Sequence, residues 1–171
     1  MTGAPGATRE DLGRLRAAAA SVPDPEIPVV TIDDLGILRA VEVTADGTVE
    51  VTLTPTYTGC PATEVIAADV ERALHDAGAH HVVVRTTLSP AWTTDWISDA
   101  GKEKLLAFGI APPDGTATAS SAGPVRLTLA ARCPRCGSLR TREISRFGST
   151  ACKSLWSCLD CSEPFDSFKV L

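Results

Sequence analysis

Long apolar runs are missing from this sequence. No stretch approaches the roughly 18 consecutive apolar residues that a membrane-spanning helix requires. The opening residues, MTGAPGATRED, lack the basic and then apolar order of a secretory signal peptide. We therefore expect a soluble, cytoplasmic protein that has no membrane partner and whose cysteines stay reduced.

Histidine is scarce, and the three histidines are poorly placed for catalysis. His75 is predicted in the C-terminal half of a helix, and His80 and His81 open a predicted strand. A cysteine nucleophile needs a base within hydrogen-bond reach. None of the three is expected beside Cys60, which precedes the helix of His75. We therefore expect no catalytic residues in this chain and no enzymatic activity of its own.

Positive charge is also in short supply, because 16 Lys and Arg residues face 21 Asp and Glu residues. Residues 1–125 carry 8 basic and 17 acidic side chains, a net charge of −9, whereas residues 126–171 carry 8 and 4, a net charge of +4. Metal-bound thiolates would offset part of this excess, so we expect no nucleic acid partner. The alternative, a phosphate-binding regulator, would use Arg132, Arg135, Arg140, Arg142 and Arg146.

The periodicity of apolar residues predicts an α+β fold with a small mixed sheet. Helical spacing and strand-like alternation follow one another in the order α-β-β-α-β-α. Gly47 supplies the positive φ that a tight turn between the first two strands requires. The predicted helices cover residues 9–21, 61–77 and 94–108, and the predicted strands cover residues 37–44, 48–56 and 81–88.

Four of the six cysteines form two C-x-x-C pairs, Cys133 with Cys136 and Cys158 with Cys161. This pattern is typical of a tetrahedral zinc site in which protein sulfurs fill all four positions, so that the ion is structural. Gly137 follows the first pair, where the backbone of a zinc-binding turn must bend tightly. Two disulfides, a redox-active pair or an iron ion on the same sulfurs remain open alternatives.

A small β zinc ribbon is predicted around these cysteines. The segments TREISRF, SLWS and FDSFKV read as three short strands, and the metal supplies folding energy that so small a core lacks. The Pro/Gly-rich residues 111–125 read as a linker. We expect an α+β domain at 9–110, the linker at 111–125 and the ribbon at 126–171.

Cys60 stands where a predicted strand gives way to a helix, between Gly59 and Pro61. The helix dipole and the N–H groups of the first turn are expected to lower the pKa of the Cys60 thiol and favour the thiolate. Cys60 is therefore a candidate metal or cluster ligand, or a nucleophile, and the alternative is a small buried residue. Cys152 is either a packed side chain or a second thiol available to a cluster.

Asp24 and Glu26 form a carboxylate pair in the segment DPEIP, which its prolines stiffen. A stiff loop can present carboxylates as ligands or hydrogen-bond acceptors. The alternative interpretation is an ordinary turn.

Three segments resemble the iron-sulfur cluster assembly domain shared by SufT-type bacterial proteins and a eukaryotic cytosolic assembly factor. They are DPEIPVVTIDDLGIL, VTLTPTYTGCPATEVI and LSPAWTTDWISDAGKEKL, and the resemblance covers about residues 12–110. The C-terminal segments CPRCGS and RFGSTACKSLWSCLDCSEPFDSFKVL resemble the ribbon of the PaaD family of phenylacetate-degradation proteins. In this resemblance the family's reactive cysteine is Cys60 and its acidic loop is Asp24-Pro25-Glu26, although PTYTGC replaces a commonly apolar stretch.

The resemblance implies an accessory subunit of the phenylacetyl-CoA epoxidase system, a ring-epoxidising multicomponent oxygenase. We expect Cys60, with Asp24, Glu26 and Cys152 as further candidate ligands, to hold iron or an iron-sulfur cluster transiently for an oxygenase or reductase subunit. One exposed thiol supplies too few ligands for a cluster, so a homodimer or a site shared with a client protein is expected. A scaffold subunit that carries no cargo is the alternative.

Overall fold

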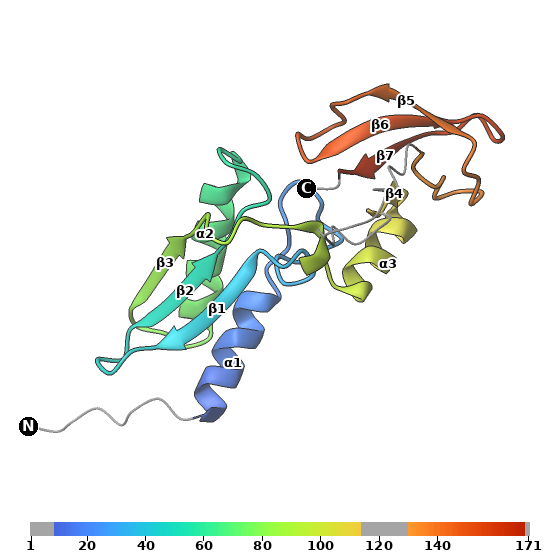
Figure 1. The fold of residues 1–171 in the computed structure, drawn as a ribbon. Helices are drawn as coiled ribbons and strands as arrows, with labels where there is room; N and C mark the ends of the chain where they lie inside the picture. The colour runs from blue at the N-terminus through green and yellow to red at the C-terminus, as the bar shows by residue number, and fades with distance from the viewer. Residues whose placement is uncertain (1–8, 114–129, 170–171) are drawn as a thin grey trace, which may run out of the picture. The chain divides into compact units, whose positions relative to one another are not determined.

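A computed structural model describes residues 9–113 and 130–169 of the chain (Figure 1). The chain divides into two compact units after Trp92, and each unit is described by itself. Within the described ranges, no helix has both the length and the apolar character needed to cross a membrane.

The first unit is a three-stranded sheet with two helices. The strand order is β1-β2-β3, with β1 antiparallel to β2 and β2 parallel to β3. This confirms the small mixed sheet that the sequence predicts, and α2 makes the crossover between the parallel strands. The elements are α1 (Arg9–Ala20), β1 (Leu38–Val43), β2 (Val49–Leu53), α2 (Ala62–Asp76) and β3 (Val82–Thr86).

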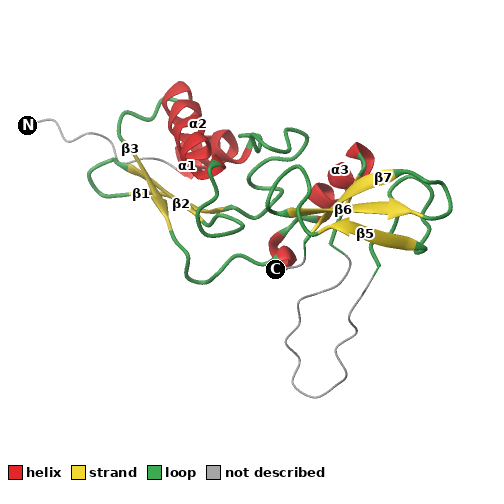
Figure 2. Cartoon of the chain, turned by 90° about the horizontal axis from the view of Figure 1, so that it is seen from above, coloured by secondary structure: helices red, strands yellow, loops and turns green. Residues whose placement is uncertain are grey.

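Both helices of the first unit cover one face of its sheet (Figure 2). Residues spaced by one helical turn in α2, Ile66, Val70 and Leu74, are all buried. Alternate residues of β2 are buried as well, among them Val49 and Val51. The core therefore lies between the helices and the sheet, where the apolar periodicity predicts it.

The second unit begins with a short 3-10 helix (Thr94–Trp96) and α3 (Asp99–Phe108). The sequence predicts one helix over 94–108, and the structure divides it at Ser98. The backbone of Ser98 is extended, and its Oγ accepts a hydrogen bond of 2.9 Å from the Gly101 N–H, so a new helix starts there. Gly109 ends α3 with a φ of 91°.

A four-stranded sheet with the order β4-β7-β6-β5 forms the rest of the second unit. The antiparallel strands β5, β6 and β7 are the three strands of the predicted ribbon. The two-residue strand β4 is not predicted, and it pairs in parallel with β7. The bounds are β4 (Ile110–Ala111), β5 (Thr141–Ser145), β6 (Lys153–Cys158) and β7 (Pro164–Phe168).

The strand β4 pairs with β7 of the ribbon sheet, α3 contacts β4, and both belong to the compact unit that follows Trp92. An α+β domain at 9–110 and a ribbon domain at 126–171 stay predictions. The expected linker at 111–125 lies outside the described residues from position 114 onward.

Candidate metal centre

The four cysteines of the C-x-x-C pairs come together in the second unit. Their sulfurs all lie within 4.8 Å of one another, and they are the single group of three or more His, Cys, Asp or Glu side chains in residues 9–113 and 130–169 that could hold a metal ion. Cys133 and Cys158 are buried and form the ribbon core with Ala111 and Phe165. The four-cysteine cluster therefore joins the turn before β5 to the turn between β6 and β7, and it is part of the packing of the ribbon.

The spacing of the sulfurs fits one tetrahedral ion. The Sγ–Sγ distance is 3.7 Å for Cys133 and Cys161 and 3.5 Å for Cys136 and Cys158. A tetrahedron with Zn–S bonds of about 2.3 Å has S–S edges of about 3.8 Å. A disulfide bond is about 2.05 Å long, and none of the six cysteines, all of which the structure describes, forms one. The donor set thus fits a closed, four-sulfur zinc site.

Each C-x-x-C pair lies on a tight turn, which we call knuckle 1 (residues 133–138) and knuckle 2 (residues 158–163). In both knuckles the residue after the second cysteine has a positive φ, which is 75° at Gly137 and 61° at Ser162. Ser162 is the single non-glycine residue with a positive φ in the described part of the chain. The sequence predicts a tight bend of the backbone after the first C-x-x-C pair, and the structure has such a bend after both pairs.

Backbone hydrogen bonds close the two knuckles in the same way. The N–H of the first cysteine donates to the carbonyl oxygen five residues later, from Cys133 to Ser138 and from Cys158 to Glu163, each at 2.9 Å. The two turns are thus an internal structural repeat. The repeat is what brings two cysteines from each turn to the same point.

Backbone N–H groups also reach the ligand sulfurs. The N–H groups of Cys161 and Asp160 lower the pKa of the Cys158 thiol to about 7. The Ser138 N–H lowers the pKa of the Cys136 thiol. The hydrogen bond between the Cys136 and Cys158 sulfurs and the loss of hydration outweigh that effect and raise the pKa of Cys136 to about 12. The turns therefore favour the thiolate of Cys158 on their own, and a dication would favour thiolates at all four positions.

Cys60 is half-buried immediately before α2. Gly59 turns the chain toward it with a φ of 83°, and the Cys60 carbonyl accepts a 3.1 Å hydrogen bond from the Thr63 N–H. Pro61 stands at the helix cap and provides no side-chain acceptor for the first turn. The thiol therefore lies where the sequence predicts it, and its role as a ligand stays a prediction.

Asp24 holds the acidic loop together. Its Oδ1 accepts hydrogen bonds from the N–H groups of Glu26, at 2.9 Å, and Ile27, at 2.8 Å, and its side chain is buried. These bonds are those of the turn that the sequence left open as an alternative. Glu26 is half-buried. A ligand role for Asp24 or Glu26 stays a prediction.

Cys152 packs inside the ribbon. It is buried, its Sγ lies 3.0 Å from the Thr150 Oγ1, and its carbonyl oxygen accepts a hydrogen bond from the Lys169 N–H. Its sulfur is not part of the four-sulfur group. Of the two alternatives that the sequence left open, the packed side chain is therefore the one that this environment favours.

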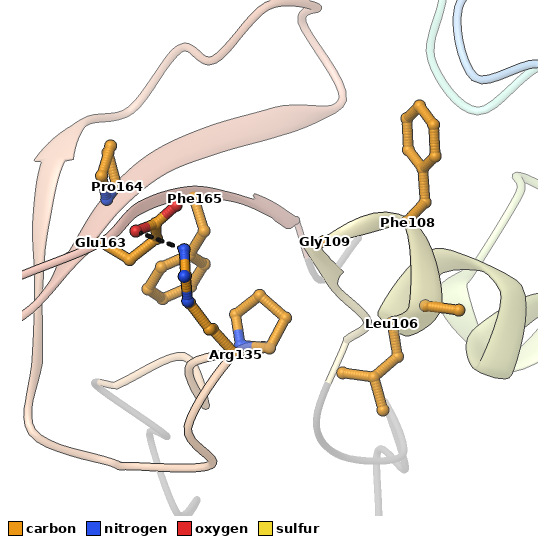
Figure 3. Close-up of a pocket in the computed structure, with 9 residues that line it drawn as sticks. Leu106, Phe108, Gly109, Arg135, Glu163, Pro164 and Phe165 are labelled. Atoms are coloured by element: carbon orange, nitrogen blue, oxygen red, sulfur yellow. Dashed lines mark ion pairs between the residues drawn. The ribbon is translucent and has the colours of Figure 1, made fainter. Parts of the chain in front are cut away.

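Two of the arginines considered for phosphate binding are paired with acids on the knuckles. The Arg135 Nη1 lies 2.8 Å from the Glu163 Oε2, and the Arg140 Nη1 lies 2.8 Å from the Asp160 Oδ1. Figure 3 shows the first pair beside a cavity of about 450 Å³ between the end of α3 and the knuckles. Asp160 and Glu163 are not predicted from the sequence, and the signal that points to them is the repeat of the two knuckles.

Each of the two parts of the chain matches a known protein family. The family described as "Iron-sulfur cluster assembly protein" matches residues 14–85, and the family described as "PaaD zinc beta ribbon domain" matches residues 117–169. The first match includes Asp24, Glu26 and Cys60, and the second includes all four cysteines of the cluster.

Similar proteins cover either nearly the whole chain or little more than half of it. A protein of Escherichia coli (strain K12) that is named as a putative subunit of 1,2-phenylacetyl-CoA epoxidase is 46% identical over 91% of this chain and 90% of its own. An "Fe-S protein maturation auxiliary factor" of Porphyromonas gingivalis is 39% identical over 60% of this chain and 91% of its own. A crystal structure of the domain of unknown function DUF59 from Bacillus anthracis, 28% identical, covers 56% of this chain and 92% of its own with a TM-score of 0.52. The chain therefore belongs to the PaaD family, in which a PaaD zinc beta ribbon follows an iron-sulfur cluster assembly domain.

Proposed function

We propose that this protein is a non-catalytic accessory factor of the phenylacetyl-CoA epoxidase system. It holds iron or an iron-sulfur cluster transiently at Cys60 and passes it to an oxygenase or reductase subunit. The observation that carries this proposal is the position of Cys60, a half-buried thiol at the start of α2 within the residues that match the cluster assembly family.

The similar proteins support a division of labour between the two parts. The Porphyromonas gingivalis maturation factor aligns over 103 residues that make up 91% of its length, which leaves no room for a further ribbon of this size. Its name points to the cluster assembly family as the counterpart, and that family matches residues 14–85 here, which include Cys60. The epoxidase-related protein aligns over nearly the whole chain, ribbon included, and it supplies the pathway in this proposal.

The chemistry of the cargo requires a second source of ligands. A thiolate is a soft ligand that suits iron and its sulfur clusters. Outside the four-cysteine cluster, the described part of this chain contains no group of three side chains that could complete such a site. Cys60 would therefore share the cargo with a second copy of the chain or with the client protein.

The ion of the four-cysteine cluster is zinc in this proposal, and its role is structural. Cys133, Cys136, Cys158 and Cys161 fill all four positions of a tetrahedron, so that no position is open for a substrate. The ribbon would then present a fixed surface to partner proteins, while Cys60 handles the cargo.

The substitution Cys60→Ser tests the cargo role in cells that lack their own copy of the gene. We expect it to abolish maturation of the epoxidase, because a hydroxyl is a poor ligand for iron at neutral pH. The matched control is Cys152→Ala, which removes the other cysteine outside the metal cluster and should leave maturation intact. Epoxidase activity in cell extracts and the zinc content of each purified variant are the measurements.

Normal epoxidase maturation in the Cys60→Ser variant would instead favour a scaffold subunit. Exposed apolar side chains on the ribbon favour that second candidate, among them Phe147, which is 70% exposed, and Leu139, Ile144 and Leu159. A scaffold would still co-purify with the oxygenase when Cys60 is replaced. Loss of maturation together with retained co-purification would support the cargo role.

A further inference from the structure

Two polar bridges join the knuckles of the metal centre, and they are reciprocal. The third residue of knuckle 1, Arg135, pairs with the sixth residue of knuckle 2, Glu163, at 2.8 Å. The third residue of knuckle 2, Asp160, accepts a 2.5 Å hydrogen bond from the Oγ of the sixth residue of knuckle 1, Ser138. Asp160 also pairs with Arg140 at 2.8 Å. Each knuckle thus holds the other through the same two positions.

Two residues of these bridges also close the knuckles. The carbonyl oxygens of Ser138 and Glu163 accept hydrogen bonds of 2.9 Å from the N–H groups of the ligands Cys133 and Cys158, respectively. A side chain that is fixed across the two knuckles therefore also fixes the backbone that carries the ligands of its own turn.

We propose that the Arg135–Glu163 and Ser138–Asp160 bridges form a clamp that holds the two ligand-bearing turns together and so sets how tightly, and for how long, the ribbon holds its zinc ion. The proposal rests on the zinc ion proposed above, and it is independent of the cargo role of Cys60. It adds four positioning residues to the metal centre, none of which touches the metal.

The exposure of the Arg135–Glu163 pair indicates that the pair affects zinc binding more than the stability of the fold. The side chains of Arg135 and Glu163 are 67% and 43% exposed, so as a simple ion pair they would contribute little to the stability of the fold. Their effect on the metal is larger, because four thiolates around one dication repel one another, and the bridges hold together the two turns that carry these thiolates. Loss of such outer partners typically lowers metal affinity by about 10-fold to 100-fold.

The first test replaces each member of the ion pair with glutamine in the full chain. We expect Arg135→Gln and Glu163→Gln each to speed the transfer of zinc to a chromophoric chelator by about tenfold. The matched control is Arg142→Gln, which removes an equal charge from the exposed surface of β5 and should leave the transfer rate within twofold of the unsubstituted protein. Equal rates for all three variants would overturn the clamp.

A charge swap separates positioning from the loss of charge. The double variant Arg135→Glu with Glu163→Arg keeps the net charge and allows the bridge to form in reverse. We expect it to recover most of the slow zinc release that the single variants lose. A single variant that cannot retain zinc counts as a loss of affinity, and failure of the swap to recover any retention would then contradict the proposal.

The second bridge provides a test that does not involve the ion pair. Ser138→Ala and Asp160→Asn should each weaken zinc binding. The Ser138→Ala/Asp160→Asn double variant should lose less than the sum of the two single losses, because both substitutions disrupt the Ser138–Asp160 bridge, although each also affects a separate contact with Arg140. Cobalt substituted for zinc should retain the visible bands of a tetrahedral four-sulfur site in every variant. A loss of these bands would mean that the ligands themselves have moved, and would assign the residues a general structural role instead.

Discussion

Ser162 occupies a backbone conformation that favours glycine. Its φ of 61° matches that of Gly137 at the equivalent position of the other knuckle, which is 75°. A residue with a side chain pays about 1 kcal/mol or more in this left-handed region, and glycine does not. The two knuckles therefore form the same turn, with glycine in one and, in the other, a serine for which the backbone conformation is less favourable.

Exchanging these residue types has opposite expected effects at the two sites. Ser162→Gly should stabilise the zinc-loaded ribbon by up to about 1 kcal/mol, less the extra freedom of glycine in the unfolded chain. Gly137→Ser should destabilise it by about 1 kcal/mol for conformational reasons alone, because nothing lies within 4 Å of a Cβ at that position. Denaturant unfolding of the zinc-loaded protein measures both, and shifts of the same sign would contradict this account.

The residues of the metal centre were predictable to the extent that their chemistry is local. The C-x-x-C spacing identifies Cys133, Cys136, Cys158 and Cys161, because two thiolates on one tight turn must face the same ion. The partner of Arg135 was not predictable in this way. Glu163 lies far from it in the sequence, and the two meet only when the ribbon brings the knuckles together.

At the scale of elements, periodicity predicted the segments that bury one full face. The helix α2 and the strand β2 both show their apolar period without interruption, and both match their predicted positions. Two features were not predicted, namely a break in the helix predicted over 94–108 and the strand β4. The break before α3 depends on one capping side chain, Ser98, and β4 is only two residues long, so its pairing with β7 leaves no periodic pattern in the sequence.

Removing the metal should affect the two sheets differently. Strands β5, β6 and β7 surround a core that includes the ligands Cys133 and Cys158, so a zinc chelator should unfold them. Strands β1, β2 and β3 have a core of aliphatic residues and should stay folded. Amide hydrogen exchange before and after chelation measures this contrast. Persisting protection of residues 153–158 without metal would show that burial alone holds the ribbon.

At the scale of the whole molecule, the chain joins two parts of different character. Residues 1–125 carry a net charge of −9, and residues 126–171 carry +4. The first part matches the cluster assembly family, and the second matches the PaaD ribbon. The sequence and the fold indicate the two domains and the candidate thiol, Cys60, on which the proposed function rests. The protein that receives the cargo depends on contact surfaces between chains, which the structure of one chain does not specify.

The cargo role of Cys60 is tested most directly by the metal content of the purified protein. The unsubstituted protein and the Cys60→Ser variant are isolated without oxygen from iron-replete cells that also express the epoxidase subunits, and zinc, iron and acid-labile sulfide are determined for each. Both proteins should contain one zinc ion per chain, and only the unsubstituted protein should contain iron as well. Equal iron in the two proteins, or none in either, would contradict the proposal that Cys60 carries the cargo.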